Sequence, residues 1–187
     1  MAEAREKALI VGLGNPGKQY AGTRHNLGQM VLCALASKYS WSFKRNALLD
    51  GEIASGGYQD KKVILLFPTT YMNLSGRAVR KAVDWFKISL SELLILSDDI
   101  ALPFEAMRYR DMGSSGGHNG LKDIEGALGT RDYSRLRLGV GMPTSQDLKD
   151  YVLSPFDKEE QEKIPDLITR AVTWIEEWLI QEIKEQA

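Results

Sequence analysis

The chain has 187 residues, with 24 basic and 25 acidic side chains and a formal net charge of −1 at pH 7. This length predicts one domain, and the near-zero charge excludes a global attraction for nucleic acid, so a polyanion has to be held by a local basic patch. The single cysteine, Cys33, excludes an internal disulfide, and no apolar run reaches the roughly 20 residues that a membrane helix needs. We therefore expect a soluble cytoplasmic protein without a membrane partner.

Strand-type and helix-type patterns alternate along most of the chain. Short apolar runs predict buried strands, and apolar residues spaced by three and four predict helices. In chain order the patterns predict a strand at 8–13, a helix at 26–39, strands at 53–55 and 63–67, a helix at 74–86, a strand at 93–96, an edge strand at 107–110, a helix at 121–128 and a strand at 136–140. A turn at Gly56-Gly57 and the polar run 60–62 separate the second and third strands, which we expect to form a hairpin.

The last thirty residues predict a long C-terminal helix. Asp157 and Glu160 have the spacing of a capping box, and Pro165 is expected to open a new segment as a first-turn residue. Apolar residues recur at helical spacing from Ile164 to Ile183 and are expected to pack on the sheet. The fold class that these patterns predict is α/β, a single domain with a twisted mixed central sheet flanked by helices.

Four segments carry residue types that core packing does not explain. The first, 12–17, is rich in glycine and follows the first strand. It has the outline of a phosphate-binding loop, but Pro16 removes one backbone N–H and no apolar helix start follows. We therefore expect a tight turn that exposes Asn15 at the carboxyl end of a strand, where open α/β sheets place their ligands.

The second segment, 69–76, also follows a strand. Its Asn73 or Ser75 could simply cap a helix. The third is Asp98-Asp99 at the end of the most apolar strand. A carboxylate there can orient an imidazole by accepting its Nδ1–H, although paired acids in a surface turn are equally compatible with the sequence.

The fourth segment is the glycine-dense loop 113–120, which contains one of the two histidines of the chain, His118. The other, His25, lies in the run 23–26. Because imidazole moves protons near neutral pH, these two residues are the candidate bases. The sequence contains no His/Cys ligand cluster, no H-E-x-x-H and no G-x-S-x-G motif, so metal hydrolysis and a serine nucleophile have little support. The mechanism that remains is one in which a base activates water.

Together these segments resemble the successive signatures of the bacterial peptidyl-tRNA hydrolase family. The matching residues are, in order, Gly12-Leu13-Gly14-Asn15-Pro16-Gly17, Tyr20, Thr23-Arg24-His25-Asn26, Pro68-Thr69-Thr70-Tyr71-Met72-Asn73-Leu74-Ser75-Gly76, Asp98 and Gly116-Gly117-His118-Asn119-Gly120-Leu121-Lys122-Asp123. The resemblance implies a monomeric enzyme without metal, cofactor or obligate protein partner. Its implied reaction is hydrolysis of the ester between a peptide and the 3′ end of tRNA, which recycles tRNA from prematurely released peptidyl-tRNA.

The resemblance also implies residue roles. His25 is implied as the base that takes a proton from water, and Asp98 as the partner that orients it. Asn15, beside Tyr20, is implied to distinguish a blocked peptidyl ester from one with a free amino group. Further contacts are implied for Tyr71, Asn73 and Asn119 in a groove for the peptide and the tRNA 3′ end, and for Arg110 and Arg137 at a terminal tRNA phosphate. His118 is expected only to orient the Asn119 loop, because no acid is evident for it.

Three positions depart from the family pattern: Ala101, where relatives usually carry an acid, Ser115, and Met142. They affect the expected loop network and tRNA contacts but not the proposed base. Affinity for tRNA is expected from a patch formed by residues such as Arg108, Arg110, Lys122, Arg135 and Arg137. A non-catalytic RNA-binding protein on the same fold is the alternative function, and binding of tRNA without turnover would support it.

Overall fold

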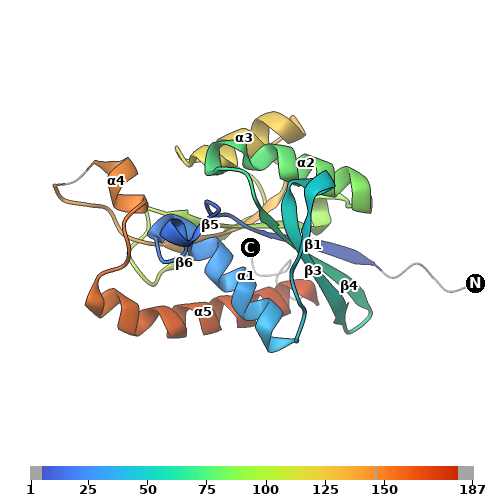
Figure 1. Ribbon diagram of the computed structural model, residues 1–187, viewed down its shortest axis with the longest axis horizontal. Helices are drawn as coiled ribbons and strands as arrows, with labels where there is room; N and C mark the ends of the chain where they lie inside the picture. Colours follow the sequence, from blue (N-terminus) through green and yellow to red (C-terminus); the bar gives the residue numbers. More distant parts are fainter. Residues whose placement is uncertain (1–5, 146, 181–187) are drawn as a thin grey trace, which may run out of the picture.

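A seven-stranded mixed sheet forms the middle layer of the molecule (Figure 1). The computed structural model describes residues 6–145 and 147–180. The strands are β1 Lys7–Gly12, β2 Lys44–Asn46, β3 Gly51–Tyr58, β4 Lys61–Pro68, β5 Leu93–Asp99, β6 Met107–Arg110 and β7 Ser134–Gly139, in the spatial order β2-β3-β4-β1-β5-β7-β6. The central four, β4, β1, β5 and β7, are parallel, and the pairs β2–β3, β3–β4 and β6–β7 are antiparallel. The predicted mixed sheet is confirmed.

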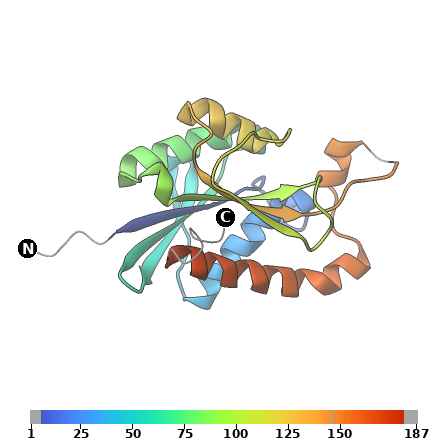
Figure 2. The same ribbon diagram turned by 180° about the vertical axis from the view of Figure 1, so that it is seen from behind.

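Helices cover both faces of this sheet, as the two opposite views show (Figures 1 and 2). One face carries α1 Leu27–Lys38 and α5 Lys158–Leu179, and the other carries α2 Ser75–Phe86 and α3 Asn119–Leu128. The remaining elements are the short helix α4 Leu148–Val152 and the 3-10 turns η1 Lys18–Tyr20, η2 Arg24–Asn26, η3 Ala47–Leu49, η4 Met72–Leu74 and η5 Leu90–Glu92. Because both faces are covered, β1, β4 and β5 are apolar on both sides rather than alternating. Within the described ranges, none of the helices combines the length and the apolar character needed to span a bilayer.

The predicted turn at Gly56-Gly57 is wrong, because both glycines lie inside β3. Tyr58 pairs with Lys61 across a two-residue turn, so the hairpin itself is confirmed but its turn lies further along the chain. The physical reason is a close contact: a Cβ on Gly56 would lie 1.8 Å from Nε1 of Trp41, whose ring packs over the strand. Here glycine marks the close approach of a side chain, not a turn.

The C-terminal helix begins where the sequence predicted, but Pro165 does not open a new segment. The Asp157 and Glu160 side chains form the expected capping box, and α5 then runs through Pro165 to Leu179. An interior proline costs about 3 kcal/mol, which this helix can offset through its cap and through the buried side chains Leu167, Ala171, Val172, Ile175, Trp178 and Leu179. Ile183, the last residue of the predicted stripe, lies outside the described residues.

The carboxyl ends of β1, β4 and β5 meet at one edge of the sheet, and the polar segments that follow these strands are therefore neighbours. Helix α1 lies unusually close to this edge. A Cβ on Gly28 would lie only 2.3 Å from the carbonyl oxygen of Leu96, so glycine allows the backbones to touch. This contact brings the turn that precedes α1, with His25, to the end of β5.

Candidate active site

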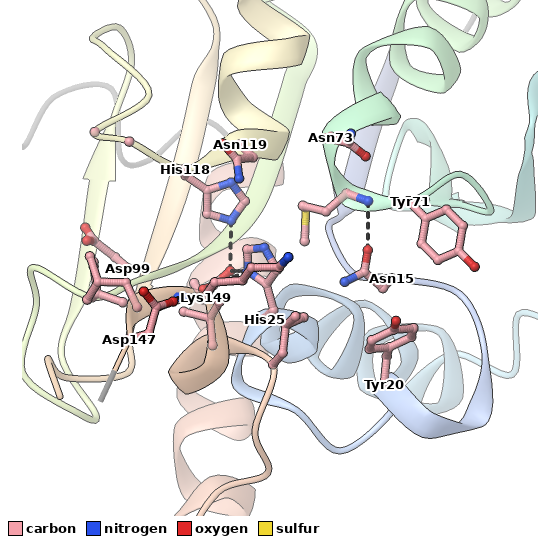
Figure 3. Close-up of a pocket in the computed structure, with 18 of the residues that line it drawn as sticks. Asn15, Tyr20, His25, Tyr71, Asn73, Asp99, His118, Asn119, Asp147 and Lys149 are labelled. Atoms are coloured by element: carbon pink, nitrogen blue, oxygen red, sulfur yellow. Dashed lines mark hydrogen bonds and ion pairs between the residues drawn. The ribbon is translucent and has the colours of Figure 1, made fainter. Parts of the chain in front are cut away.

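A cavity of about 800 Å³ opens at the carboxyl edge of the sheet (Figure 3). Residues from six separate segments line it, which explains why each signal was weak in the sequence alone. Eight of the nine predicted site residues are among them: Asn15, Tyr20, His25, Tyr71, Asn73, Asp98, Asn119 and Arg137. The ninth, Arg110, lies on the exposed edge strand β6 and is not part of this lining within the described chain.

His25 and Asp98 form the expected imidazole–carboxylate pair. Nδ1 of His25 lies 2.9 Å from Oδ1 and 3.0 Å from Oδ2 of Asp98. Since a carboxylate can only accept, Nδ1 carries the proton and Nε2 carries the lone pair. No group of the described residues hydrogen-bonds Nε2, so this nitrogen is available to accept a proton.

The pair perturbs the pKa of both groups. Burial lowers the pKa of His25, but the charge and the hydrogen bond of Asp98 outweigh burial and leave that pKa above its ordinary value. For Asp98, burial raises the pKa, and the two neighbouring histidines reverse this effect and hold the pKa well below its usual range. Asp98 is therefore a carboxylate at neutral pH, and the basicity of His25 depends on it.

His118 also binds Asp98, which corrects the expectation that it lacks an acid. Its Nε2 lies 2.8 Å from Oδ1 of Asp98. Its Nδ1 accepts hydrogen bonds from the backbone N–H groups of Gly120, at 3.1 Å, and Leu121, at 3.3 Å, and so caps α3. The expected support for the Asn119 loop is confirmed by this cap. Both nitrogens of His118 are thus occupied, with the proton on Nε2.

The three residues His25, Asp98 and His118 place one ligand-type atom each within 4.8 Å of one another, which is the spacing of a metal site. Both histidines, however, direct a protonated nitrogen at Asp98. A metal ion could bind there only if Nδ1 of His25 and Nε2 of His118 lost those protons and hydrogen bonds. The free Nε2 of His25 is better placed for a proton from water.

Asn15 has a fixed amide orientation. Its Oδ1 accepts the backbone N–H of Met72 at 2.8 Å, so its Nδ2 remains as a donor (Figure 3). The residue is 7% exposed. Tyr20 and Tyr71 flank it in Figure 3, the first partly buried and the second exposed. Aromatic rings beside a single free amide donor suit an extended peptide segment.

Asn73 and Asn119 present exposed side chains to the same cavity from η4 and from the first turn of α3. The helix-cap interpretation of Asn73 or Ser75 is wrong: the residue at the N-cap of α2 is Leu74, which makes no side-chain cap bond, and Ser75 instead donates to the carbonyl of Met72. Asn73 therefore precedes α2 but lines the cavity and does not cap the helix.

Arginines on β6 and β7 have unequal roles. Nε of Arg137 forms an ion pair with Oδ2 of Asp99 at 3.0 Å at the cavity wall. Arg108 and Arg110 are exposed on β6, directly opposite Arg137 and Arg135. Arg135 is fully buried and donates to the carbonyls of the glycine-dense loop, so its expected place in a surface patch is wrong.

The sequence did not predict the contribution of α4. Asp147, Leu148 and Lys149 line the cavity. Figure 3 shows Asp147 beside Asp99. Helix α4 has only five residues, too few for a periodic pattern, and the only signal for it is Asp147, whose side chain accepts the backbone N–H of Lys149. None of the three positions that depart from the family pattern, Ala101, Ser115 and Met142, lines the cavity.

Comparisons with known proteins show the family to which the chain belongs. The family model described as peptidyl-tRNA hydrolase matches residues 9–187. A peptidyl-tRNA hydrolase of Chloroflexus aggregans is 47% identical over 170 residues, which is 90% of this chain and 90% of the relative. One of Cytophaga hutchinsonii is 49% identical over 168 residues, covering 88% and 87%. The crystal structure of peptidyl-tRNA hydrolase from Acinetobacter baumannii matches with a TM-score of 0.91 and 33% identity, covering 99% of this chain and 94% of that chain.

Proposed function

Because the chain belongs to the bacterial peptidyl-tRNA hydrolase family, we propose that His25 and Asp98 perform its hydrolytic step and that the surrounding amides and arginines hold its substrate. The protein is an enzyme that hydrolyses the ester bond of peptidyl-tRNA and so recycles the tRNA. The observation that supports these residue roles best is the free Nε2 of His25, held at the cavity by an ionised Asp98. Family membership decides against the alternative of a non-catalytic RNA-binding protein.

The reaction begins when Nε2 of His25 takes a proton from water and the water oxygen attacks the ester carbonyl carbon. The tetrahedral intermediate then breaks its bond to the ribose oxygen, which receives a proton from the imidazolium. The products are the peptide carboxylic acid and tRNA with a free hydroxyl. General-base assistance is worth on the order of 10²- to 10⁴-fold in rate. An ester is reactive enough that this, with hydrogen bonds to the developing oxyanion, suffices without a covalent intermediate.

Asn15 would select substrates by the atom it offers. With Oδ1 bound to Met72, only the Nδ2 donor remains for the substrate. An N-acylated residue supplies a carbonyl oxygen that accepts from this donor. A free ammonium group supplies only donors, so it leaves Nδ2 without a partner in a largely buried position. This mismatch would favour a peptidyl or N-blocked ester over an aminoacyl ester.

The tRNA is assigned to the basic side of the site. Nε of Arg137 faces Asp99, which leaves its other guanidinium donors for a phosphate. Exposed Arg108 and Arg110 continue this side along β6. With few phosphate contacts, the salt dependence of binding should be shallow. We further propose that the enzyme acts in the cytoplasm as a monomer, without metal, cofactor or obligate protein partner.

The test of this function is release of an N-blocked amino acid from its tRNA, measured in the presence of a chelator. His25→Asn should lower turnover on the order of 10²- to 10⁴-fold, while wild-type turnover should be unaffected by the chelator. Wild-type turnover in His25→Asn would remove the assigned base. Loss of wild-type activity on chelation would replace the mechanism with a metal-dependent one.

A further inference from the structure

Asn26, the neighbour of His25 in the sequence, makes an unusual pair of contacts. Its side-chain oxygen accepts the backbone N–H of Asn15 at 2.9 Å, and its side-chain nitrogen donates to the carbonyl of the same residue at 2.9 Å. A third bond, from the same nitrogen to Oε1 of Gln29, measures 3.0 Å. One amide thus holds both backbone polar groups of one residue.

This contact is built into the fold and excludes water. Asn26 has no exposed surface. It stands at the N-cap position of α1, but its side chain makes no cap bond there, so the helix does not account for its residue type. A Cβ on Gly14 would lie 2.8 Å from the Asn26 amide, and only glycine leaves room for it beside the loop. The loop and the amide therefore fit one another.

The consequence for Asn15 is a fully constrained residue. Its backbone is fixed on both sides by Asn26, and its side-chain oxygen is fixed by the backbone of Met72. The three hydrogen bonds therefore also fix the direction in which the remaining polar group, Nδ2, can donate. Preorganised donors of this kind cost no reorganisation when the substrate binds.

We propose that Asn26 is a positioning residue for substrate selection: it holds the loop so that Nδ2 of Asn15 meets the carbonyl oxygen of the substrate's N-acyl group. This inference rests on the proposed function of Asn15. This positioning role differs from two others: stabilising the fold alone, and acting on catalysis through the adjacent His25. Asn26 itself does not touch the substrate.

The test is a double-mutant cycle with Asn15→Ala, Asn26→Ala and the double variant. Each is assayed as kcat/KM for an N-acetylated aminoacyl-tRNA and for the same aminoacyl-tRNA with a free amine. Loss of one oriented hydrogen bond is worth about tenfold, so Asn26→Ala should lower the blocked-to-free ratio by about this factor. In the Asn15→Ala background it should lower the ratio no further, because the group that it positions is already gone.

Two controls separate this role from a structural one. Gln29→Ala removes the third bond of Asn26 but neither bond to Asn15, and it should leave the ratio unchanged. The acid limb of the pH profile of kcat/KM reports the pKa of His25, and it should lie at the same pH in Asn26→Ala as in the wild type. If Asn26→Ala does not fold, Asn26→Asp replaces it in the cycle, because it has the same shape and keeps an acceptor for the Asn15 N–H. It loses the donor to the Asn15 carbonyl and to Gln29, and Gln29→Ala controls for the second loss.

The possible outcomes are distinct. An equal loss in both backgrounds, or a shifted acid limb, would overturn the inference, because Asn26 would then act through the fold or through His25. If Asn15→Ala alone leaves the blocked-to-free ratio unchanged, the proposed function of Asn15 fails first. A normal effect of Asn15→Ala with no effect of Asn26→Ala or Asn26→Asp would contradict the inference alone.

Discussion

His25 and His118 bind the same carboxylate oxygen, Oδ1 of Asp98, with ring centroids 4.9 Å apart, yet their environments differ. His25 stands in a 3-10 turn, uses Nδ1 for Asp98 and keeps Nε2 free. His118 stands at the start of α3, uses Nε2 for Asp98 and gives Nδ1 to two backbone N–H groups. The comparison teaches that the second nitrogen of each ring, and not its distance from the acid, decides which histidine can act as a base.

The largest expected effect in this comparison comes from Asp98→Asn. Asparagine removes the negative charge and replaces one carboxylate oxygen with an NH₂ group, which can only donate. Because Nδ1 of His25 lies 2.9 and 3.0 Å from the two carboxylate oxygens, this NH₂ group faces Nδ1 in either amide orientation. Nδ1 then becomes an acceptor, the proton moves to Nε2 and the base is lost. We expect kcat to fall on the order of 10²- to 10⁴-fold with little change in KM. A rise in KM at unchanged kcat would assign Asp98 to substrate binding.

The next largest effect is on the free energy of unfolding, through Arg24, the residue before His25. Arg24 is buried and donates to Oε2 of Glu160 at 2.6 Å and to the carbonyl of Pro155 at 2.8 Å, which ties the turn of His25 to the start of α5. Arg24→Met leaves Glu160 without its partner, so the free energy of unfolding should fall by about 3 kcal/mol. Urea denaturation measures this, and a change below about 0.5 kcal/mol would mean that the ion pair is not an anchor.

His118→Asn should have a smaller effect on activity than Asp98→Asn. It removes one donor from Asp98, whose charge then acts more strongly on His25 and raises the pKa of that ring further. The base is active only when deprotonated, so the acid limb of kcat/KM should move to higher pH, with a loss of about tenfold at neutral pH. A limb that moves to lower pH would contradict the shared role of Asp98.

The smallest expected effect is that of Arg137→Gln, which lies outside the histidine pair. Removing one phosphate contact should raise KM for the tRNA ester and reduce the slope of log affinity against log salt by about 1. The kcat should be nearly unchanged, because Arg137 does not contact His25 or Asp98. As a matched control, Arg135→Gln should reduce stability rather than the salt slope, because Arg135 is buried against the glycine-dense loop.

Most of the fold was predictable from periodicity. Strands β1, β4 and β5 are apolar runs, and the capping box of α5 is a local pattern. Two of the misses share one cause, which is that tertiary contacts override local signals. Gly56 looks like a turn until Trp41 is packed on it, and Pro165 looks like a helix start until the rest of α5 is docked. The three-residue edge strand β2 has no apolar run and gave no signal.

The site was predictable in its members more than in its connections. Strand ends and the family resemblance indicated His25, Asp98 and Asn15. The second bond of Asp98, to His118, was missed because the two residues are 20 positions apart and only the fold brings them together. The clamp of Asn26 on Asn15 was missed for the same reason. Long-range hydrogen bonds between loops leave no periodic trace in a sequence.

The central claim is that His25 is the base because its Nε2 carries the lone pair, whereas His118 is held in the opposite tautomer. The chain has only two histidines, so long-range proton–nitrogen NMR of the imidazole rings can resolve both. Near pH 8 we predict that His25 is protonated on Nδ1 and His118 on Nε2, and that His25 titrates above its ordinary pKa of 6.5. Protonation of His25 on Nε2, or the same tautomer in both rings, would contradict the account.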